Sequence, residues 1–144
     1  MSQYFKEFRS DLSQAGHNWP QAAGLVYQLI LLNGYSFNEA HQFVSDLTGE
    51  CVGTGYARKT LANKTLIDVG SSPTKKGWDC DDIPYTTPTG WTTTCGVIAR
   101  IIGGDSTSKL CFFLDGGTSP DNFPKTMIGT NFTFIVSASG LILI

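Results

Sequence analysis

Three aspartates, Asp79, Asp81 and Asp82, stand close together in the stretch WDCDDIPY, with Cys80 among them. Aspartates in loops are ligands for Ca²⁺, which takes about six to eight oxygen atoms. Their spacing does not match the D-x-[DN]-x-[DN]-G pattern of the calcium-binding loop. If the stretch is a strand, alternation places Trp78 and Cys80 on a buried face and the neighbouring aspartates toward water. We therefore predict a structural role for the aspartates and no metal, with a Ca²⁺ site as the alternative.

General acid–base catalysis uses histidine, or carboxylates held in a cleft with altered pKa values. The two histidines, His17 and His41, lie apart from each other among polar neighbours. The sequence has no G-x-S-x-G element, no Gly-rich phosphate loop followed by Lys and Ser or Thr, and no H-E-x-x-H. We predict no catalytic residue, no enzymatic activity and no cofactor.

Four cysteines are spread along the chain without a C-x-x-C pair, which argues against the common zinc and thioredoxin-like sites. They are Cys51, Cys80, Cys95 and Cys111. We expect buried, reduced thiols, because disulfides are rare in proteins that fold in a reducing cytoplasm. The alternation of the surrounding strand places Cys95 inward together with Val97 and Ala99.

The composition is that of one small β-rich domain. The chain has 144 residues, of which 15% are charged and 16 are glycine, with a net charge of −2. No basic run is present to hold a phosphate backbone, so nucleic acid is not an expected partner. The first residues lack the apolar core of a signal peptide, and the longest apolar run is too short to cross a bilayer. We expect a protein made in the cytoplasm, without a membrane partner.

The elements that must position these residues begin with a short amphipathic helix. Tyr4, Phe8 and Leu12 follow one another at intervals of four residues, with Phe5 beside them. We divide the chain into an N-terminal helix or arm, residues 1–18, and a β-domain, residues 19–144. A short isolated helix is marginal in water, so the four apolar side chains must be buried. We predict that they bind a partner, and the alternative is that they complete the domain's own core.

The remaining chain predicts short strands separated by turn signals, with a loop containing a helical turn over residues 35–50. The predicted strands are residues 25–32, 57–62, 64–70, 77–81, 94–102, 109–115, 130–136 and 141–144. The fourth ends at a turn at Ile83-Pro84, and the last two form a hairpin. A second hairpin, centred on Asp105 and Ser106, places Cys111 opposite Arg100. The fold class is therefore mainly β, a single-domain antiparallel sandwich or barrel of about eight strands with a short N-terminal helix.

Residues 19–144 resemble a group of small structural proteins of tailed bacteriophages. The most specific part is GTGYARKTLANKTL, and the aspartate stretch follows it in the same order as in those proteins. Cys80, Pro84 and the loop residues Gly103-Gly104-Asp105 depart from the pattern of the group. The segments that carry the resemblance are VYQLILLNGYSFNEAHQFVSDLTGECVGTGYARKTLANKTL, WDCDDIPY, GVIARIIGGDSTSKLCFFLDGG and FTFIVSASGLILI.

The resemblance implies a virion component located on the capsid surface. The favoured role is a capsid decoration, or cement, protein that binds the major capsid protein and itself, most simply as a homotrimer. The stripe Tyr4, Phe5, Phe8 and Leu12 is the expected contact with the capsid lattice or a sister subunit. A tail or fibre accessory protein is the alternative, although fibre proteins more often show repeats or heptads. A virion-associated hydrolase is the weakest alternative.

Overall fold

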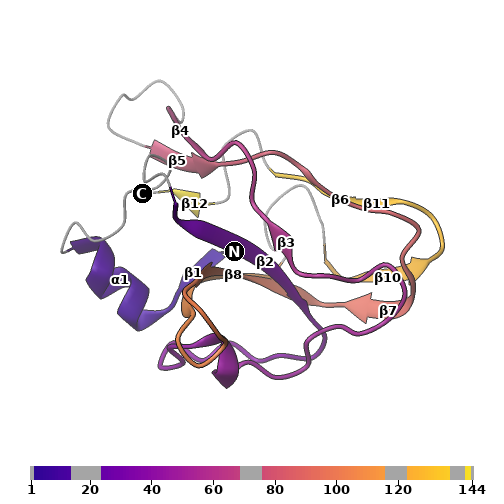
Figure 1. Cartoon of the computed structure of the whole chain (residues 1–144), viewed down its shortest axis with the longest axis horizontal. Coiled ribbons are helices and arrows are strands. Elements are labelled where there is room, and N and C mark those ends of the chain that lie inside the picture. The colour runs from indigo at the N-terminus through magenta and orange to yellow at the C-terminus, as the bar shows by residue number, and fades with distance from the viewer. Residues whose placement is uncertain (1, 14–23, 69–75, 116–122, 137–141, 144) are drawn as a thin grey trace.

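A computed structural model describes residues 2–13, 24–68, 76–115, 123–136 and 142–143 (Figure 1). Within these residues the chain is mainly β, with the α-helix α1 (Lys6–Ser13) and the 3₁₀ helix η1 (Val44–Asp46). The described strands are β1 (Ser2–Tyr4), β2 (Val26–Leu32), β3 (Lys59–Thr60), β4 (Thr65–Asp68), β5 (Lys76–Asp79), β6 (Ile83–Tyr85), β7 (Thr89–Thr93), β8 (Cys95–Ile101), β9 (Lys109–Leu114), β10 (Lys125–Ile128), β11 (Phe132–Phe134) and β12 (Ile142–Leu143).

The central feature is a five-stranded antiparallel sheet in the order β1-β9-β8-β2-β3. Its middle strands are continuous apolar runs, as expected for strands that are covered on both faces. The predicted strand at 25–32 is confirmed as β2, and the predicted hairpin is confirmed as β8 and β9. The predicted loop with a helical turn is also confirmed, since η1 is the one helical element between β2 and β3.

Each face of the central sheet covers a separate cluster of buried side chains. The larger core includes Leu29, Ile98 and Phe112, and the smaller core includes Ile30 and Val97. The predicted inward position of Cys95, beside Val97 and Ala99, is confirmed in the smaller core. Thus neighbouring residues of one strand serve different cores, and the sheet is buried on both sides.

The register of the β8–β9 hairpin differs from the predicted one because it contains a β-bulge. Arg100 pairs with Lys109, and Ile98 pairs with Phe112, so Cys111 has no direct cross-strand partner in β8. The prediction that Cys111 faces Arg100 is therefore wrong. The extra residue allows Cys111 and Phe112 to enter the same larger core, because a bulge interrupts the alternation of faces.

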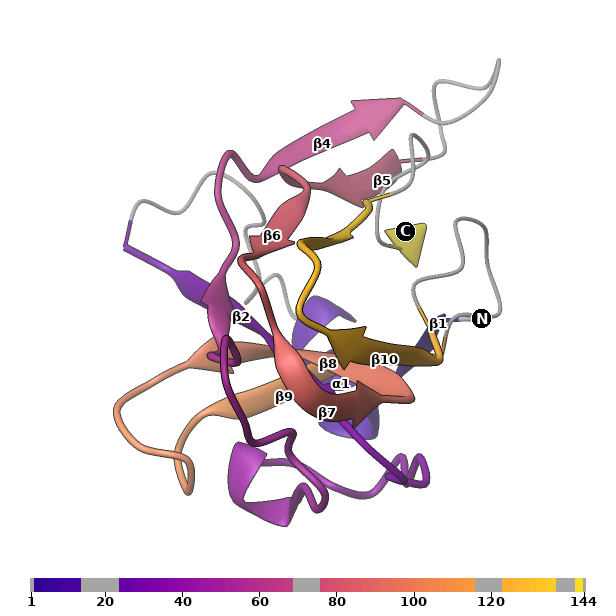
Figure 2. The ribbon, with the colours of Figure 1, turned by 90° about the vertical axis from the view of Figure 1, so that its right-hand side faces the viewer.

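Smaller antiparallel sheets lie across the larger core from the central sheet: β10-β7, β11-β6 and β12-β5-β4. In Figure 2, β4 and β5 lie at the opposite end of the molecule from the β8–β9 hairpin. Two predictions are wrong here. Ile83 and Pro84 belong to β6 instead of a turn, and β12 pairs with Trp78 and Gly77 of β5 instead of with β11. The predicted turn between the last two strands, at residues 139–140, lies outside the described residues.

The N-terminal segment joins the central sheet. Ser2–Tyr4 form the edge strand β1 against β9, and α1 begins only at Lys6. The prediction that Tyr4 lies on the helix is therefore wrong, because the edge of β9 takes the first residues as a strand. No helix in the described part of the chain is long and apolar enough to cross a membrane.

Candidate functional site

The aspartate stretch is tied to the protein itself. Asp81 accepts a hydrogen bond of 2.6 Å from the Asn63 amide, and Asp82 accepts one of 2.7 Å from the backbone N–H of Val136. Trp78 and Cys80 are buried, Asp79 is half-buried and Asp81 is exposed, which confirms the predicted alternation in part, because β5 ends at Asp79. Among the described residues, no three His, Cys, Asp or Glu side chains are grouped so that they could hold a metal ion.

His41 has a partner within the fold, and the four thiols are buried in it. His41 lies 2.8 Å from the Tyr35 hydroxyl through its Nδ1, and His17 lies outside the described residues. All four cysteines, each of which is described, are buried thiols. Burial raises the pKa of Cys51, and burial beside the aspartates raises the pKa of Cys80 to about 12. A raised pKa leaves the thiol protonated at neutral pH and therefore a poor nucleophile.

The predicted partner-binding side chains are divided between the two cores. Phe5 enters the smaller core, where its ring lies 5.1 Å from Phe37. Phe8 enters the larger core and meets the Trp78 ring edge-on at 5.4 Å. Tyr4 is half-buried and stacks on Phe8 at 6.1 Å. Leu12 belongs to α1, but its side chain lies outside the described set. The positions of Phe5 and Phe8 thus agree with the alternative interpretation, in which the stripe completes the domain's own core.

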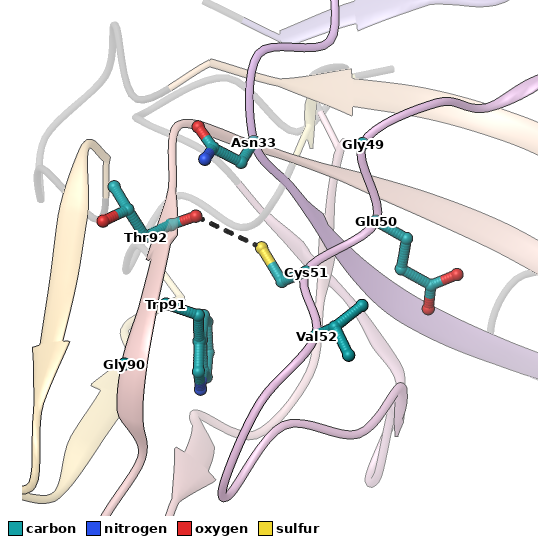
Figure 3. Close-up of a pocket in the computed structure, with 8 residues that line it drawn as sticks. All are labelled: Asn33, Gly49, Glu50, Cys51, Val52, Gly90, Trp91 and Thr92. Carbon is teal, nitrogen blue, oxygen red and sulfur yellow. Dashed lines mark hydrogen bonds between the residues drawn. The ribbon is translucent and has the colours of Figure 1, made fainter.

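A surface hollow of about 500 Å³ was not indicated by any motif (Figure 3). It lies between strand β7 on one side and Asn33 with residues 49–52 on the other. Figure 3 shows the Trp91 side chain between β7 and residues 49–52. The Cys51 thiol closes one side by donating a 3.4 Å hydrogen bond to the carbonyl oxygen of Thr92. Its lining residues are Asn33, Gly49, Glu50, Cys51, Val52, Gly90, Trp91 and Thr92.

Gly49, which lines the hollow, and Gly53, just beyond the lining, allow close backbone approach there. Gly49 has φ +77°, and a Cβ atom there would lie 2.3 Å from the carbonyl oxygen of Asn33. Gly53 has φ +149°, and a Cβ atom there would lie 2.7 Å from the Trp91 ring. The close glycines in GECVGTGYAR were therefore the one sequence signal for this site, since glycine tolerates positive φ and close backbone approach.

A polar clamp holds the segment beside the hollow. Arg58 donates to both Glu50 oxygens at 2.7 Å and to Asp105 at 2.6 and 3.0 Å. The Tyr56 hydroxyl donates to Glu50 at 2.9 Å. Hydrogen bonds from Arg58 lower the pKa of Asp105, and burial followed by the Glu50 charge raises the pKa of Tyr56. The carboxylates of this clamp are thus engaged with Arg58.

The volume falls within the range of about 300–1,000 Å³ that is usual for small-molecule sites. The lining residues offer amide, hydroxyl, backbone and apolar contacts. None of them is an activated nucleophile, because Cys51 is buried with a raised pKa and Glu50 is paired. The hollow is suited to binding by shape and hydrogen bonding.

No protein-family model, curated protein or solved structure matches the chain. The resemblance to phage structural proteins therefore stays a prediction based on the sequence segments quoted above.

Proposed function

We propose that the protein is a structural component of a bacteriophage virion, most simply a cement protein that binds the major capsid protein and stabilises the head. The proposal rests on the sequence resemblance, together with one structural observation: the central sheet is buried on both faces by two cores. Such a body is a rigid module suited to repeated contacts. It would be made in the host cytoplasm and reside on the capsid surface, without nucleic acid or membrane as a direct partner.

The proposal includes two finer statements. The sheets form a sandwich, which is supported by the larger core lying between the central sheet and the strands β6, β7 and β11. The protein also associates with itself as a closed oligomer, most simply a trimer, because closed symmetry is the usual arrangement of soluble oligomers. Exposed apolar side chains available for such contacts include Val52, which is 82% exposed, and Ile128, which is 75% exposed.

The decisive experiment is to locate the protein in purified particles by imaging and by mass-spectrometric stoichiometry. A cement protein occurs in proportion to the major capsid protein and lies on the shell. A few copies at the tail would instead establish the accessory role, and absence from particles would reject both. A parallel assay on host envelope material should show no hydrolysis, and a triple variant of His17, His41 and Asp81 should assemble normally.

A further inference from the structure

The N-terminal arm, defined here as residues 2–13, contacts the body along a seam that includes strand β9, the loop residues Phe37 and Glu39, and Trp78 of β5. Tyr4 pairs with Phe112, and the backbone N–H of Phe5 donates to the carbonyl of Cys111 at 3.1 Å. The N–H of Lys6 donates to the carbonyl of Glu39 at 2.9 Å. From this seam Phe5 and Phe8 reach the two cores and become buried. The pairing of β9, β8 and β2 with one another involves none of the arm's residues, so release of the arm would leave these strand pairs in place.

We infer that the arm is exchanged between copies. Residues 2–13 of one copy then occupy the seat of another copy, meaning the edge of β9 and the positions that Phe5 and Phe8 fill in the two cores. An identical arm makes the same strand pairs and fills the same two core positions, so the contacts of the seat are conserved. The structure shows this seat filled by the chain's own arm, and the identical arm of a second copy is the occupant that we propose.

An arm that simply left its seat would carry a large penalty. The edge of β9 would be open, and this strand has the apolar sequence KLCFFL. The positions of Phe5 and Phe8, which are 0% and 2% exposed, would be left empty in both cores. Exchange avoids this penalty, since each vacated seat receives another arm. Exchange also lets the predicted partner-binding side chains Phe5 and Phe8 contact a sister subunit while they stay buried.

The chain between arm and body is long enough for exchange. Ten residues, 14–23, separate Ser13 from Gly24. At a maximum of about 3.3–3.6 Å per residue they span up to about 35 Å. A domain of this length has a radius of gyration of about 14 to 15 Å. The arm can therefore reach the seat of an adjacent copy.

Concentration decides between the closed and exchanged forms. A short connection of about ten residues gives a tethered segment an effective concentration of the order of millimolar for its own binding site. Copies must therefore be crowded to a similar level, as on a particle surface, before exchange competes. The inference rests on the self-association part of the proposed function and gives that association a mechanism.

The test joins arm and seat of different molecules by a disulfide. Lys6 and Glu39 are exposed neighbours, joined by the backbone hydrogen bond described above. The single variants Lys6→Cys and Glu39→Cys, distinguished by isotope labelling, are mixed at about 1 mM and then oxidised. We expect a covalent heterodimer whose disulfide joins positions 6 and 39. The matched control pairs Lys6→Cys with Thr133→Cys, an exposed position in β11, and should give severalfold less heterodimer.

The double variant Lys6→Cys/Glu39→Cys provides the second part of the test. When it is oxidised in dilute solution, an internal disulfide holds each arm in its own seat, and sedimentation should then show loss of the oligomer. Oligomers that persist in the locked variant, or that form without the 6–39 cross-link, would overturn arm exchange and leave self-association standing. Monomers alone, free and on particles, together with no cross-link, would overturn both.

Discussion

The N-terminal arm and the segment at residues 49–58 both pair with strands of the central sheet, the arm with β9 and the segment with β2, but their side chains are held by opposite means. The arm is held by Phe5 and Phe8, which are almost completely buried. The segment is held by the partly exposed clamp of Glu50, Arg58 and Asp105. Apolar burial involves no titrating group and is not screened by salt, whereas exposed ion pairs are screened by salt and contribute little. The arm should therefore contribute more to stability than the clamp does.

The largest effect is expected in the arm. Phe8→Ala removes an aromatic side chain from the larger core and should reduce the free energy of unfolding by about 3–5 kcal/mol. Urea denaturation measures the change, and Glu7→Ala on the exposed side of the same helix is the control, with an effect near zero. A loss below about 1 kcal/mol for Phe8→Ala would show that the seat is not part of the core.

The next effect concerns the backbone beside the hollow. Gly49→Ala and Gly34→Ala place Cβ atoms at nearly the same φ, +77° and +76°, but only the first would meet another atom within 4 Å. In both variants the free energy of unfolding should fall by about 1–2 kcal/mol, because alanine is disfavoured in the left-handed conformation. Gly49→Ala should lose more, because its Cβ would press on the carbonyl of Asn33. Equal losses, measured by denaturation, would mean that the backbone contact relaxes without cost.

A smaller effect is expected in the clamp. The side chains of Arg58, Glu50 and Asp105 are 26%, 33% and 52% exposed. Because of this exposure, Arg58→Met should cost only about 1 kcal/mol, and the cost should shrink as salt is raised. Lys125→Met, at an exposed position of β10, is the matched loss of a positive charge. A loss comparable to that of Phe8→Ala would contradict the contrast between the two segments.

The smallest effect is a pH dependence. Asp46 accepts hydrogen bonds of 2.9 Å from the backbone N–H groups of Gln42 and Phe43, and these bonds lower its pKa. Since the folded pKa is depressed, the stabilisation is fully present above the ordinary aspartate pKa of about 3.9 and is lost as pH falls through the lower folded value. Denaturation midpoints should therefore fall more steeply in acid for the wild type than for Asp46→Asn. The loss of unfolding free energy in Phe8→Ala, relative to the wild type, should stay constant over the same pH range. A loss that changes with pH would be inconsistent with apolar burial.

The sequence was sufficient where the signal is local. Strand β2 and the β8–β9 hairpin are continuous apolar runs bounded by turn residues, and both were predicted. The buried side of the aspartate stretch followed from simple alternation. Strands β6, β7 and β10 were missed because they are short and rich in Thr, Pro or Gly, and they become strands only by pairing with distant partners.

The polar clamp beside the hollow could not be predicted from the sequence, for the same physical reason. Arg58 and Asp105 are separated by 47 residues, and no spacing rule joins them. Tyr4 was assigned to a helix because its spacing from Phe8 fits a helical period, but the edge of β9 takes it as a strand. In each case a non-local partner determines the structure of a short segment whose own preference is weak.

Hydrogen exchange of the arm amides tests the central claim most directly. The N–H groups of Phe5 and Lys6 are bonded to the body, whereas those in the middle of β2 belong to the centre of the sheet. If the arm is a seated but separately releasable part of the core, its amides should exchange more slowly than an unstructured chain and faster than those of Leu29 and Ile30. Exchange at the unstructured rate would contradict the seated arm, and exchange as slow as that of β2 would contradict its release.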